Sequence, residues 1–254
     1  ADSAQQDFVL DFGGCAHLTD SVLARIVAHL PGHMQRLIVN LQRAPQISSA
    51  GLVSLVDGCK SASRLTTFCL RMARCAWLDD TGLVSLASGA LRGVRHLSLD
   101  FSRCGLSDEG AASIARAFHA MDLLDLRLDL GDCDWITDFG LNALANSFCG
   151  LMQLKSLVLR LGGSRVADTW VSALSASLSR LSSLERLSLC IDGKLRQASI
   201  RAIGDALNHL AKLSDISLAL NGVEGDAWEG RRGRRGKTWR PDHGEGVRAL
   251  AQGL

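Results

Sequence analysis

The amino-acid sequence predicts an α/β solenoid of about eight repeats, with a curved parallel sheet on its concave side and helices on its convex side. Two observations predict this fold. Leucine accounts for 43 of the 254 residues, and the pattern L-x-L-x-L-x-x plus a final, mostly small residue recurs every 29 to 31 residues. The final position of the pattern falls at Cys15, Ala44, Cys75, Cys104, Cys133, Ser164, Lys194 and Val223. Such a period is typical of solenoids, in which stacked repeats bury a core that one repeat cannot bury alone.

Each repeat divides into a strand, a turn and a helix. Alternating leucines, as in residues 126–130, predict a strand with one buried face. A tight turn follows, and then Ser, Thr or Asp precedes a new periodicity, as at Thr137 and Asp138, where either residue can cap a helix. Apolar residues at helical spacing over residues 141–148 predict the helix itself.

Composition indicates one globular unit, a single domain over residues 1–254. The chain is 47% hydrophobic and carries a net charge of +2, which excludes a disordered chain. No stretch is long and apolar enough to span a membrane. The first residues, ADSAQQ, lack both a secretory signal and a starting Met. We therefore expect a reducing intracellular compartment, and a removed targeting segment leaves cytosol and organelle open.

The sequence predicts no catalytic, cofactor-binding or metal site. Four of the eight cysteines recur in the turn column, where a small residue packs and its sulfur can accept weak hydrogen bonds from turn amides. The other four show no C-x-x-C spacing, which argues against zinc. Phosphate-binding glycine motifs and the G-x-S-x-G nucleophile motif do not occur after the predicted strands.

The last repeat carries a basic Gly/Arg-rich insertion at residues 224–243. Gly246 lies 23 residues after Val223, whereas the matching Gly82 lies 7 after Cys75. Without residues 231–240 the remaining chain has 22 positive and 26 negative side chains, a net charge of −4. The segment predicts binding to an acidic protein surface or to nucleic acid, or a solvated loop that only steers encounters. Its candidate binding residues are Arg231, Arg232, Arg234, Arg235, Lys237, Trp239 and Arg240.

The five tryptophans are predicted to lie near one rim, where strands lead into helices. Trp77 and Trp135 share one repeat position, two residues after a cysteine, and either bind a partner or cover the end of the core. Trp170 replaces the glycine that opens the helix in repeats two to five, which favours an interface or a role in packing a loop. Trp228 and Trp239 complete this candidate partner-binding rim.

A row of charged residues is predicted across the concave face. Four residues before each turn position stand Asp11, Asn40, Arg71, Asp100, Asp129, Arg160, Cys190 and Ala219. Because neighbouring strands lie about 4.8 Å apart, Arg71 can pair with Asp100 and Asp129 with Arg160, while Arg127 adds another cation. The patch either neutralises itself or recognises a partner of mixed charge. Its candidate binding residues are Arg71, Asp100, Arg127, Asp129 and Arg160.

The segments CDWITDFGLNALA (133–145) and CAWLDDTGLVSLA (75–87) resemble leucine-rich repeats. The C-x-x-[I/L]-[T/D]-D-x-G-L core is similar to the cysteine-containing subclass found in substrate adaptors of ubiquitin ligases, and the repeat length to the ribonuclease-inhibitor-like subclass. The resemblance implies a non-catalytic protein–protein interaction scaffold. Because no capping sequence is evident at either end, we expect an accessory or structural subunit of a larger assembly. A substrate adaptor or enzyme inhibitor is one alternative, and an anionic-surface or nucleic-acid contact through the basic loop is another.

Overall fold

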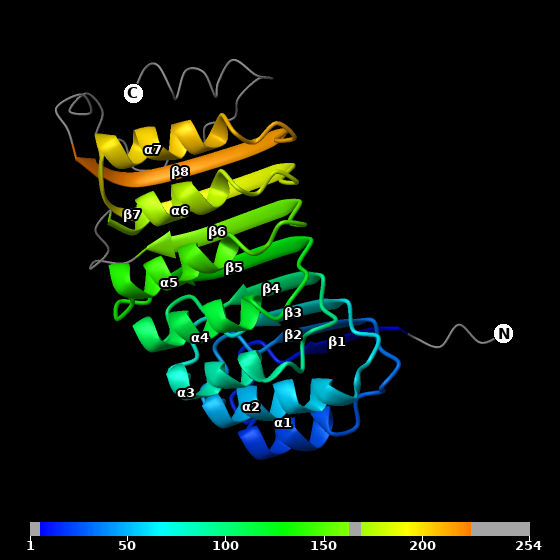
Figure 1. Cartoon of the computed structure of the whole chain (residues 1–254). Helices are drawn as coiled ribbons and strands as arrows, with labels where there is room; N and C mark the ends of the chain where they lie inside the picture. The colour runs from blue at the N-terminus through cyan, green and yellow to red at the C-terminus, as the bar shows by residue number, and fades with distance from the viewer. Residues whose placement is uncertain (1–5, 163–168, 225–254) are drawn as a thin grey trace.

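The structure, a computed structural model, describes residues 6–162 and 169–224. Within them, parallel strands in sequence order form one sheet, and helices follow the strands along one side of it (Figure 1). The strands are β1 (Asp7–Asp11), β2 (Arg36–Asn40), β3 (Thr67–Arg71), β4 (His96–Asp100), β5 (Asp125–Gly131), β6 (Ser156–Gly162), β7 (Arg186–Arg196) and β8 (Asp215–Glu224). The helices are α1 (Asp20–Val27), α2 (Ser49–Gly58), α3 (Asp80–Leu83), α4 (Asp108–Phe118), α5 (Asp138–Phe148), α6 (Thr169–Leu178) and α7 (Gln197–Leu207), with 3-10 turns at Cys59–Ser61 and Val84–Ser88.

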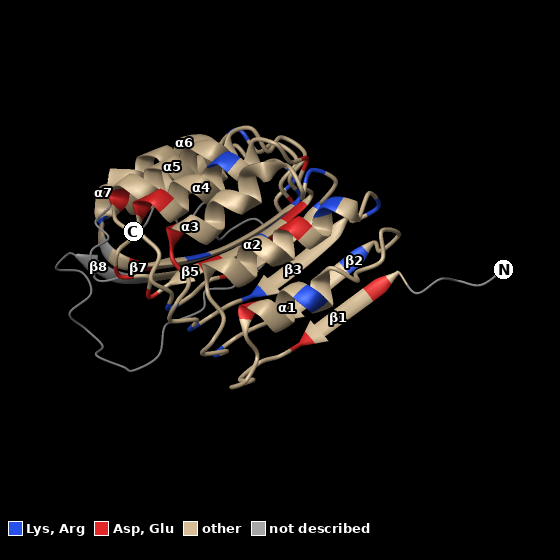
Figure 2. Ribbon diagram, turned by 90° about the horizontal axis from the view of Figure 1, so that it is seen from below, with Lys and Arg blue, Asp and Glu red and all other residues tan. Residues whose placement is uncertain are grey.

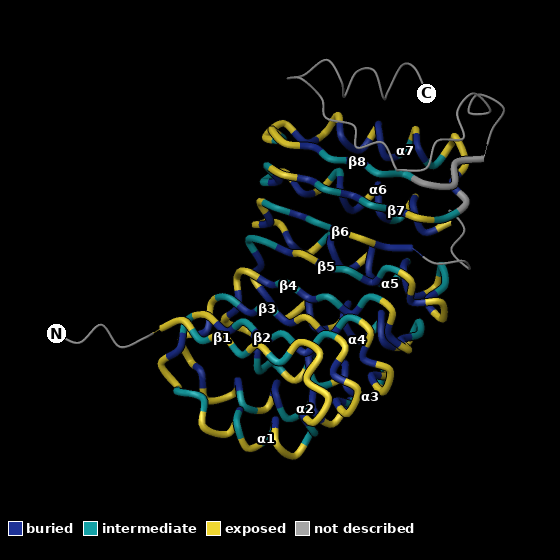
Figure 3. The backbone as a smooth tube through the Cα atoms, turned by 180° about the vertical axis from the view of Figure 1, so that it is seen from behind, coloured by how far each residue is buried: buried dark blue, intermediate teal, exposed yellow. Residues whose placement is uncertain are grey.

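The strand register confirms the predicted α/β solenoid and the predicted row on the concave face. Each member of that row, from Asp11 to Ala219, is the direct register partner of the next. Along the strands, buried residues such as Leu37, Leu97 and Leu126 alternate with exposed or half-buried ones (Figure 3). The core therefore forms one continuous layer between sheet and helices, as stacked repeats require.

The predicted turns at Lys194 and Val223 are wrong, because both residues lie within strands. A bulge between Asp192 and Leu195 shifts the register, and pairing with β8 then continues to Arg196. The bulge returns Leu195 to the core face, where it is buried, and α7 begins directly afterwards. Of the predicted insertion at 224–243, only Glu224 lies within the described residues.

A carboxylate clamp joins the starts of successive helices. The predicted cap Thr137 accepts a hydrogen bond from the Phe139 amide of its own helix. The aspartate that follows each cap binds the cap of the next repeat. Asp108, which follows the cap Ser107, accepts hydrogen bonds from the Thr137 amide and hydroxyl, both at 2.7 Å. Equivalent clamps are Asp20–Ser48 and Asp80–Ser107, and Asp138 accepts in a similar way from Thr169, the first residue of α6. The motif thus ties each repeat to its neighbour.

The recurring glycines make room for this clamp. A Cβ atom at Gly140 would lie 2.6 Å from the Asp108 carboxylate oxygen, and the same clash would arise between Gly110 and Asp80. Between α2 and α3 the donor belongs to the earlier repeat and the acceptor to the later one: the Ser49 hydroxyl donates to the Asp79 carboxylate at 2.6 Å. Hydrogen bonds from Ser49 and Thr81 lower the pKa of Asp79, which keeps this carboxylate ionised.

The turn cysteines form a second link between repeats. The Sγ atoms of Cys75, Cys104 and Cys133 donate to backbone carbonyls of the preceding repeat at 3.1 to 3.2 Å. The prediction had the sulfur as the acceptor, whereas the Sγ atoms donate in the hydrogen bonds above. Burial raises the pKa of each thiol, and backbone amides of the preceding turn lower it to a smaller extent. The pKa rises to about 11 for Cys75 and Cys133 and to about 12 for Cys104. Cys15, in the first repeat, is exposed.

We expect these thiols to resist alkylation in the folded protein. Iodoacetamide at pH 8 reacts with thiolates, and burial both raises the pKa of Cys104 and blocks access to it. Peptide mass spectrometry should show Cys15 labelled first, while Cys75, Cys104 and Cys133 react only in denaturant. Labelling of Cys104 at the rate of Cys15 without denaturant would contradict the packing of the column.

Candidate functional site

The concave face carries two adjoining hollows of about 290 and 420 Å³, which share Asp100, Asp129 and Arg160. We call their charged lining the arginine groove; its members are Arg43, Arg71, Arg74, Arg127, Arg160, Asp100 and Asp129. Five arginines against two aspartates give the groove a net positive charge. It lies toward the carboxyl ends of the central strands because the residues of one register row share a face and an edge of the sheet.

Asp100 and Asp129 both accept hydrogen bonds from other groups of this chain. Asp100 accepts hydrogen bonds from the Gln42 side chain at 2.9 Å and from the Ser102 hydroxyl at 2.7 Å. Asp129 accepts from the Gly131 amide at 3.0 Å and pairs with Arg160 at 3.5 Å, as the sequence predicts. Burial raises the pKa of Asp129, and the neighbouring Asp100 carboxylate adds to this effect, while Arg160 opposes it.

Most of the groove arginines have no such partner. The predicted pair of Arg71 with Asp100 is wrong: their strands are in register, yet Gln42 and Ser102 hold the carboxylate instead. Within residues 6–162 and 169–224, the guanidinium groups of Arg43, Arg71, Arg74 and Arg127 form no ion pair or hydrogen bond. The groove therefore presents free guanidinium groups beside carboxylates that already accept hydrogen bonds from this chain.

The opposite ends of the strands show the contrary arrangement. Arg36 pairs with Asp7 at 3.6 Å, and Asp125 receives both His96 and Arg186. Acidic and basic residues are distributed over strands and connections of the whole sheet (Figure 2). Ion pairs form at both ends, but at the carboxyl ends, where Asp129 pairs with Arg160, four groove arginines are left without a partner among the described residues. The charge available for a ligand is concentrated at the carboxyl ends.

Three rim arginines occupy a strained backbone conformation that sequence reasoning missed. Arg43, Arg74 and Arg103 have φ angles of 56°, 62° and 59°, in the left-handed region that glycine prefers. Gly14 holds this position in the first repeat and Asp132 in the fifth. Each arginine costs roughly 1 kcal/mol there, and strain of this kind is concentrated at functional sites. In the sequence these arginines share one feature: each directly precedes the final position of the repeat pattern, which is Ala44, Cys75 or Cys104.

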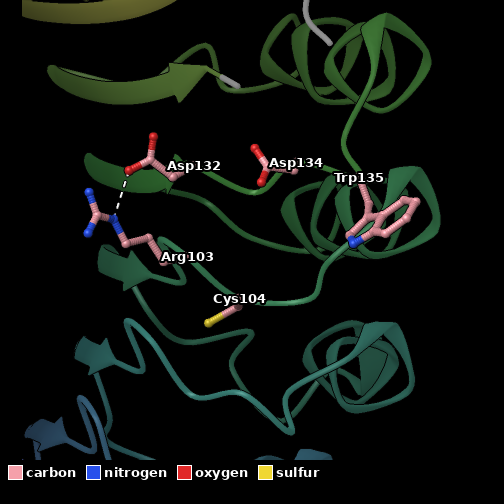
Figure 4. Close-up of a pocket in the computed structure, with 5 residues that line it drawn as sticks. All are labelled: Arg103, Cys104, Asp132, Asp134 and Trp135. Carbon is pink, nitrogen blue, oxygen red and sulfur yellow. Dashed lines mark hydrogen bonds and ion pairs between the residues drawn. The ribbon is translucent and has the colours of Figure 1, made fainter. Parts of the chain in front are cut away.

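A separate hollow of about 560 Å³ lies on the rim, lined by Arg103, Cys104, Asp132, Asp134 and Trp135 (Figure 4). Arg103 pairs with Asp132 at 2.8 Å. Trp135 is 60% exposed, and Trp77, in the same repeat position two repeats earlier, is 69% exposed. Both tryptophans therefore lie on the surface, where a partner can reach them.

The prediction that Trp170 belongs to the rim is wrong. Its side chain is 0% exposed and packs in the core at the start of α6. In repeats two to five a glycine occupies this place at the start of the helix. Trp228, Trp239 and the basic candidates Arg231, Arg232, Arg234, Arg235, Lys237 and Arg240 lie outside the described residues.

The described residues contain no group of three or more His, Cys, Asp or Glu side chains arranged to hold a metal ion. None of the helices in this part of the chain is long and apolar enough to cross a membrane.

Comparison with known proteins identifies the repeat. The profile of the leucine-rich repeat family matches residues 95–115 and 126–145, which are the consecutive β4–α4 and β5–α5 units. A solved internalin structure from Listeria monocytogenes matches with a TM-score of 0.48 and 18% identity, over 86% of this chain. This chain spans 56% of that internalin chain. A search of curated proteins by sequence finds no match.

Proposed function

Because this chain is a leucine-rich repeat protein, a class whose concave surfaces generally bind other proteins, we propose that its arginine groove binds an acidic segment of a protein partner. The single observation that carries the proposal is the set of guanidinium groups that have no partner among the described residues, beside carboxylates that already accept hydrogen bonds from this chain. Arginines at interfaces bind carboxylates through two parallel hydrogen bonds, which gives both affinity and orientation.

The aspartates favour a protein segment over nucleic acid as the ligand. Asp100 and Asp129 are adjacent in the row and interrupt the run of positive charge. A continuous phosphate backbone would meet both carboxylates, whereas a peptide can place separate acidic side chains at the arginines and amide donors at the aspartates. Binding to nucleic acid through residues 231–240 remains the alternative.

We further propose that the chain acts as a non-catalytic accessory subunit in a reducing intracellular compartment, which its eight free thiols support. A dissociable substrate adaptor or inhibitor would use the same groove. Size-exclusion chromatography of the native complex separates the two roles. An accessory subunit should co-elute with one fixed set of proteins, whereas an adaptor should exchange partners within minutes.

The groove is tested by reversing its free charges. The double variant Arg71→Glu/Arg127→Glu should weaken binding of a labelled peptide of alternating Glu and Ser at least about tenfold, a loss of roughly 1.4 kcal/mol. The reason is that two attractive contacts become repulsive. Fluorescence anisotropy at low and at physiological salt measures the change, and a single-stranded DNA of equal charge serves as the competing ligand.

A matched control comes from the paired end of the sheet. The double variant Arg36→Glu/Arg186→Glu changes the net charge equally but reverses arginines that already have acidic partners. It should bind the peptide within about twofold of the unaltered protein, apart from the long-range effect of net charge. Equal weakening in both variants, or tighter binding of the DNA, would rule out recognition by the groove.

A further inference from the structure

The turn residues with a left-handed backbone stack into one column across neighbouring repeats. We call them the turn ladder; its members are Gly14, Arg43, Arg74, Arg103 and Asp132, with φ angles of 56° to 71°. The amide of each member donates a hydrogen bond to a backbone carbonyl of the next repeat, at 2.7 to 3.0 Å. Consecutive members therefore lie one strand spacing apart, about 4.8 Å.

Side chains at consecutive positions of the turn ladder can reach one another. Arg103 and Asp132 are consecutive members, and they form an ion pair at 2.8 Å (Figure 4). Arg43 and Arg74 are consecutive members as well, but both are positively charged, so they repel each other instead of pairing. Neither guanidinium group has an ion pair or hydrogen bond with any residue that the structure describes. An anion placed between these two arginines would contact both.

The space beside this pair is open. Arg43 and Arg74 line the hollow of about 420 Å³, and Gly14 leaves part of its wall without a side chain. A Cβ atom at Gly14 would meet no atom within 4 Å apart from its chain neighbours. The carboxylates in the lining, Asp100 and Asp129, already accept hydrogen bonds from this chain. The hollow can therefore admit an anionic group next to the two arginines.

The charge of the arginine groove matches a phosphate group better than a carboxylate at this place. The five arginines of the groove exceed its two aspartates by three positive charges. A phosphate monoester at neutral pH carries a charge of about −2, so together with one carboxylate it balances this excess. Its three terminal oxygens also accept parallel hydrogen bonds from two guanidinium groups, whereas one guanidinium group already fills the two oxygens of a carboxylate.

We propose that Arg43 and Arg74 bind a phosphorylated serine or threonine in the acidic segment of the partner, while Arg71 and Arg127 bind its carboxylates. This inference rests on the proposed function and names the ligand of one part of the groove. Phosphorylation of the partner strengthens the complex, because the phosphate accepts charge-assisted hydrogen bonds that a serine hydroxyl cannot match. The strained backbone of both arginines fits this role, since such strain is concentrated at functional sites.

Peptide binding to the full chain tests the phosphate site. The probes are the labelled peptide of alternating Glu and Ser, the same peptide with one central serine phosphorylated, and a charge-matched peptide in which two serines are replaced by glutamate. In fluorescence anisotropy at physiological salt, the phosphopeptide should bind at least about tenfold tighter than the unmodified peptide. The charge-matched peptide should gain less than about threefold, because it adds charge without the third oxygen of a phosphate.

Glycine provides a variant that removes both side chains and keeps the turn. Gly14 holds the equivalent position with a φ angle of 71°, so Arg43→Gly/Arg74→Gly introduces a residue that accepts this conformation without strain. In this variant the phosphorylated and unmodified peptides should bind within about twofold of each other. Circular dichroism checks that the variant is folded.

The matched control is Arg95→Gln/Arg180→Gln. It also removes two positive charges, from exposed arginines outside the groove that form no ion pair in the described part of the chain. This variant should keep the preference for the phosphopeptide of about tenfold. Because each variant is judged by the ratio of two peptide affinities, the long-range effect of its net charge largely cancels.

The proposal is overturned if phosphorylation leaves the affinity unchanged, if the charge-matched peptide gains as much, or if Arg43→Gly/Arg74→Gly keeps the preference. Tighter binding of a single-stranded DNA of equal charge would also overturn it. Failure of the groove itself gives a different result. If Arg71→Glu/Arg127→Glu weakens the unmodified peptide but phosphorylation has no effect, only the phosphate site is wrong. If the phosphopeptide depends on Arg43 and Arg74 but not on Arg71 and Arg127, the phosphate site stands and the carboxylate contacts are wrong.

Discussion

Replacing Asp108 with alanine will lower the free energy of unfolding by about 3 kcal/mol. Asp108 accepts hydrogen bonds from the amide and hydroxyl of Thr137 and from the Gly140 amide, at 2.7 to 2.9 Å. All three donors belong to the start of α5, and the variant removes their shared acceptor. Each half-buried donor left without a partner costs about 1 kcal/mol or more. Urea denaturation followed by circular dichroism measures the loss.

The matched control is Asp122→Ala, which removes an exposed carboxylate that forms no hydrogen bond within the described residues. It should change stability by less than about 0.5 kcal/mol. The glycine partner offers a second check. Gly110→Ala should destabilise the protein by pushing its Cβ against Asp80, and the double variant Gly110→Ala/Asp80→Ala should lose less than the two single variants added together. Full additivity would show that the glycine and the carboxylate do not share this space.

Truncating Trp170 to alanine will destabilise the protein by about 3 to 5 kcal/mol, because the fully buried indole would leave a large cavity in the core. Trp170→Phe should cost less than about 1.5 kcal/mol. The indole Nε1 is buried without a hydrogen-bond partner among the described residues, so phenylalanine removes an unsatisfied donor while it keeps most of the apolar volume. Chemical denaturation of both variants gives the comparison.

Trp135→Ala is the surface counterpart of this experiment. Its side chain is mostly exposed, so the variant should lose less than about 1 kcal/mol. Similar losses for Trp170→Ala and Trp135→Ala would contradict the assignment of one tryptophan to the core and the other to the rim.

Periodicity alone predicted the fold and the order of residues along the concave face. A period-two strand leaves only one choice of face, so the row from Asp11 to Ala219 follows once the repeats are aligned. The same alignment wrongly predicted a turn at Lys194. The bulge between Asp192 and Leu195 hardly changes the sequence pattern, but it lets the strand continue to Arg196. The carboxylate clamp was not predicted either. The motif lies within one repeat, and the sequence does not show that its aspartate accepts hydrogen bonds from the cap residue of the next repeat.

The candidate site was harder to predict than the fold. Charge complementarity in the row suggested that Arg71 pairs with Asp100, but Gln42, from the turn after β2, donates a hydrogen bond to the same carboxylate. The replacement of glycine by Trp170 looked like a new surface feature, although burial decides its role and burial depends on how α5 and α6 pack. The strained backbone of Arg43, Arg74 and Arg103 could not be predicted from residue type, because arginine does not favour a positive φ angle.

The carboxylate clamp runs in one direction along the chain. In four of the five links that the described residues form, the acceptor belongs to the earlier repeat and the donors to the later one, from Asp20 in α1 to Thr169 in α6. A ribosome releases the earlier repeat first. During synthesis, α2, α4, α5 and α6 therefore each follow a repeat that already carries the carboxylate acceptor for the start of that helix, so the solenoid can lengthen by one repeat at a time.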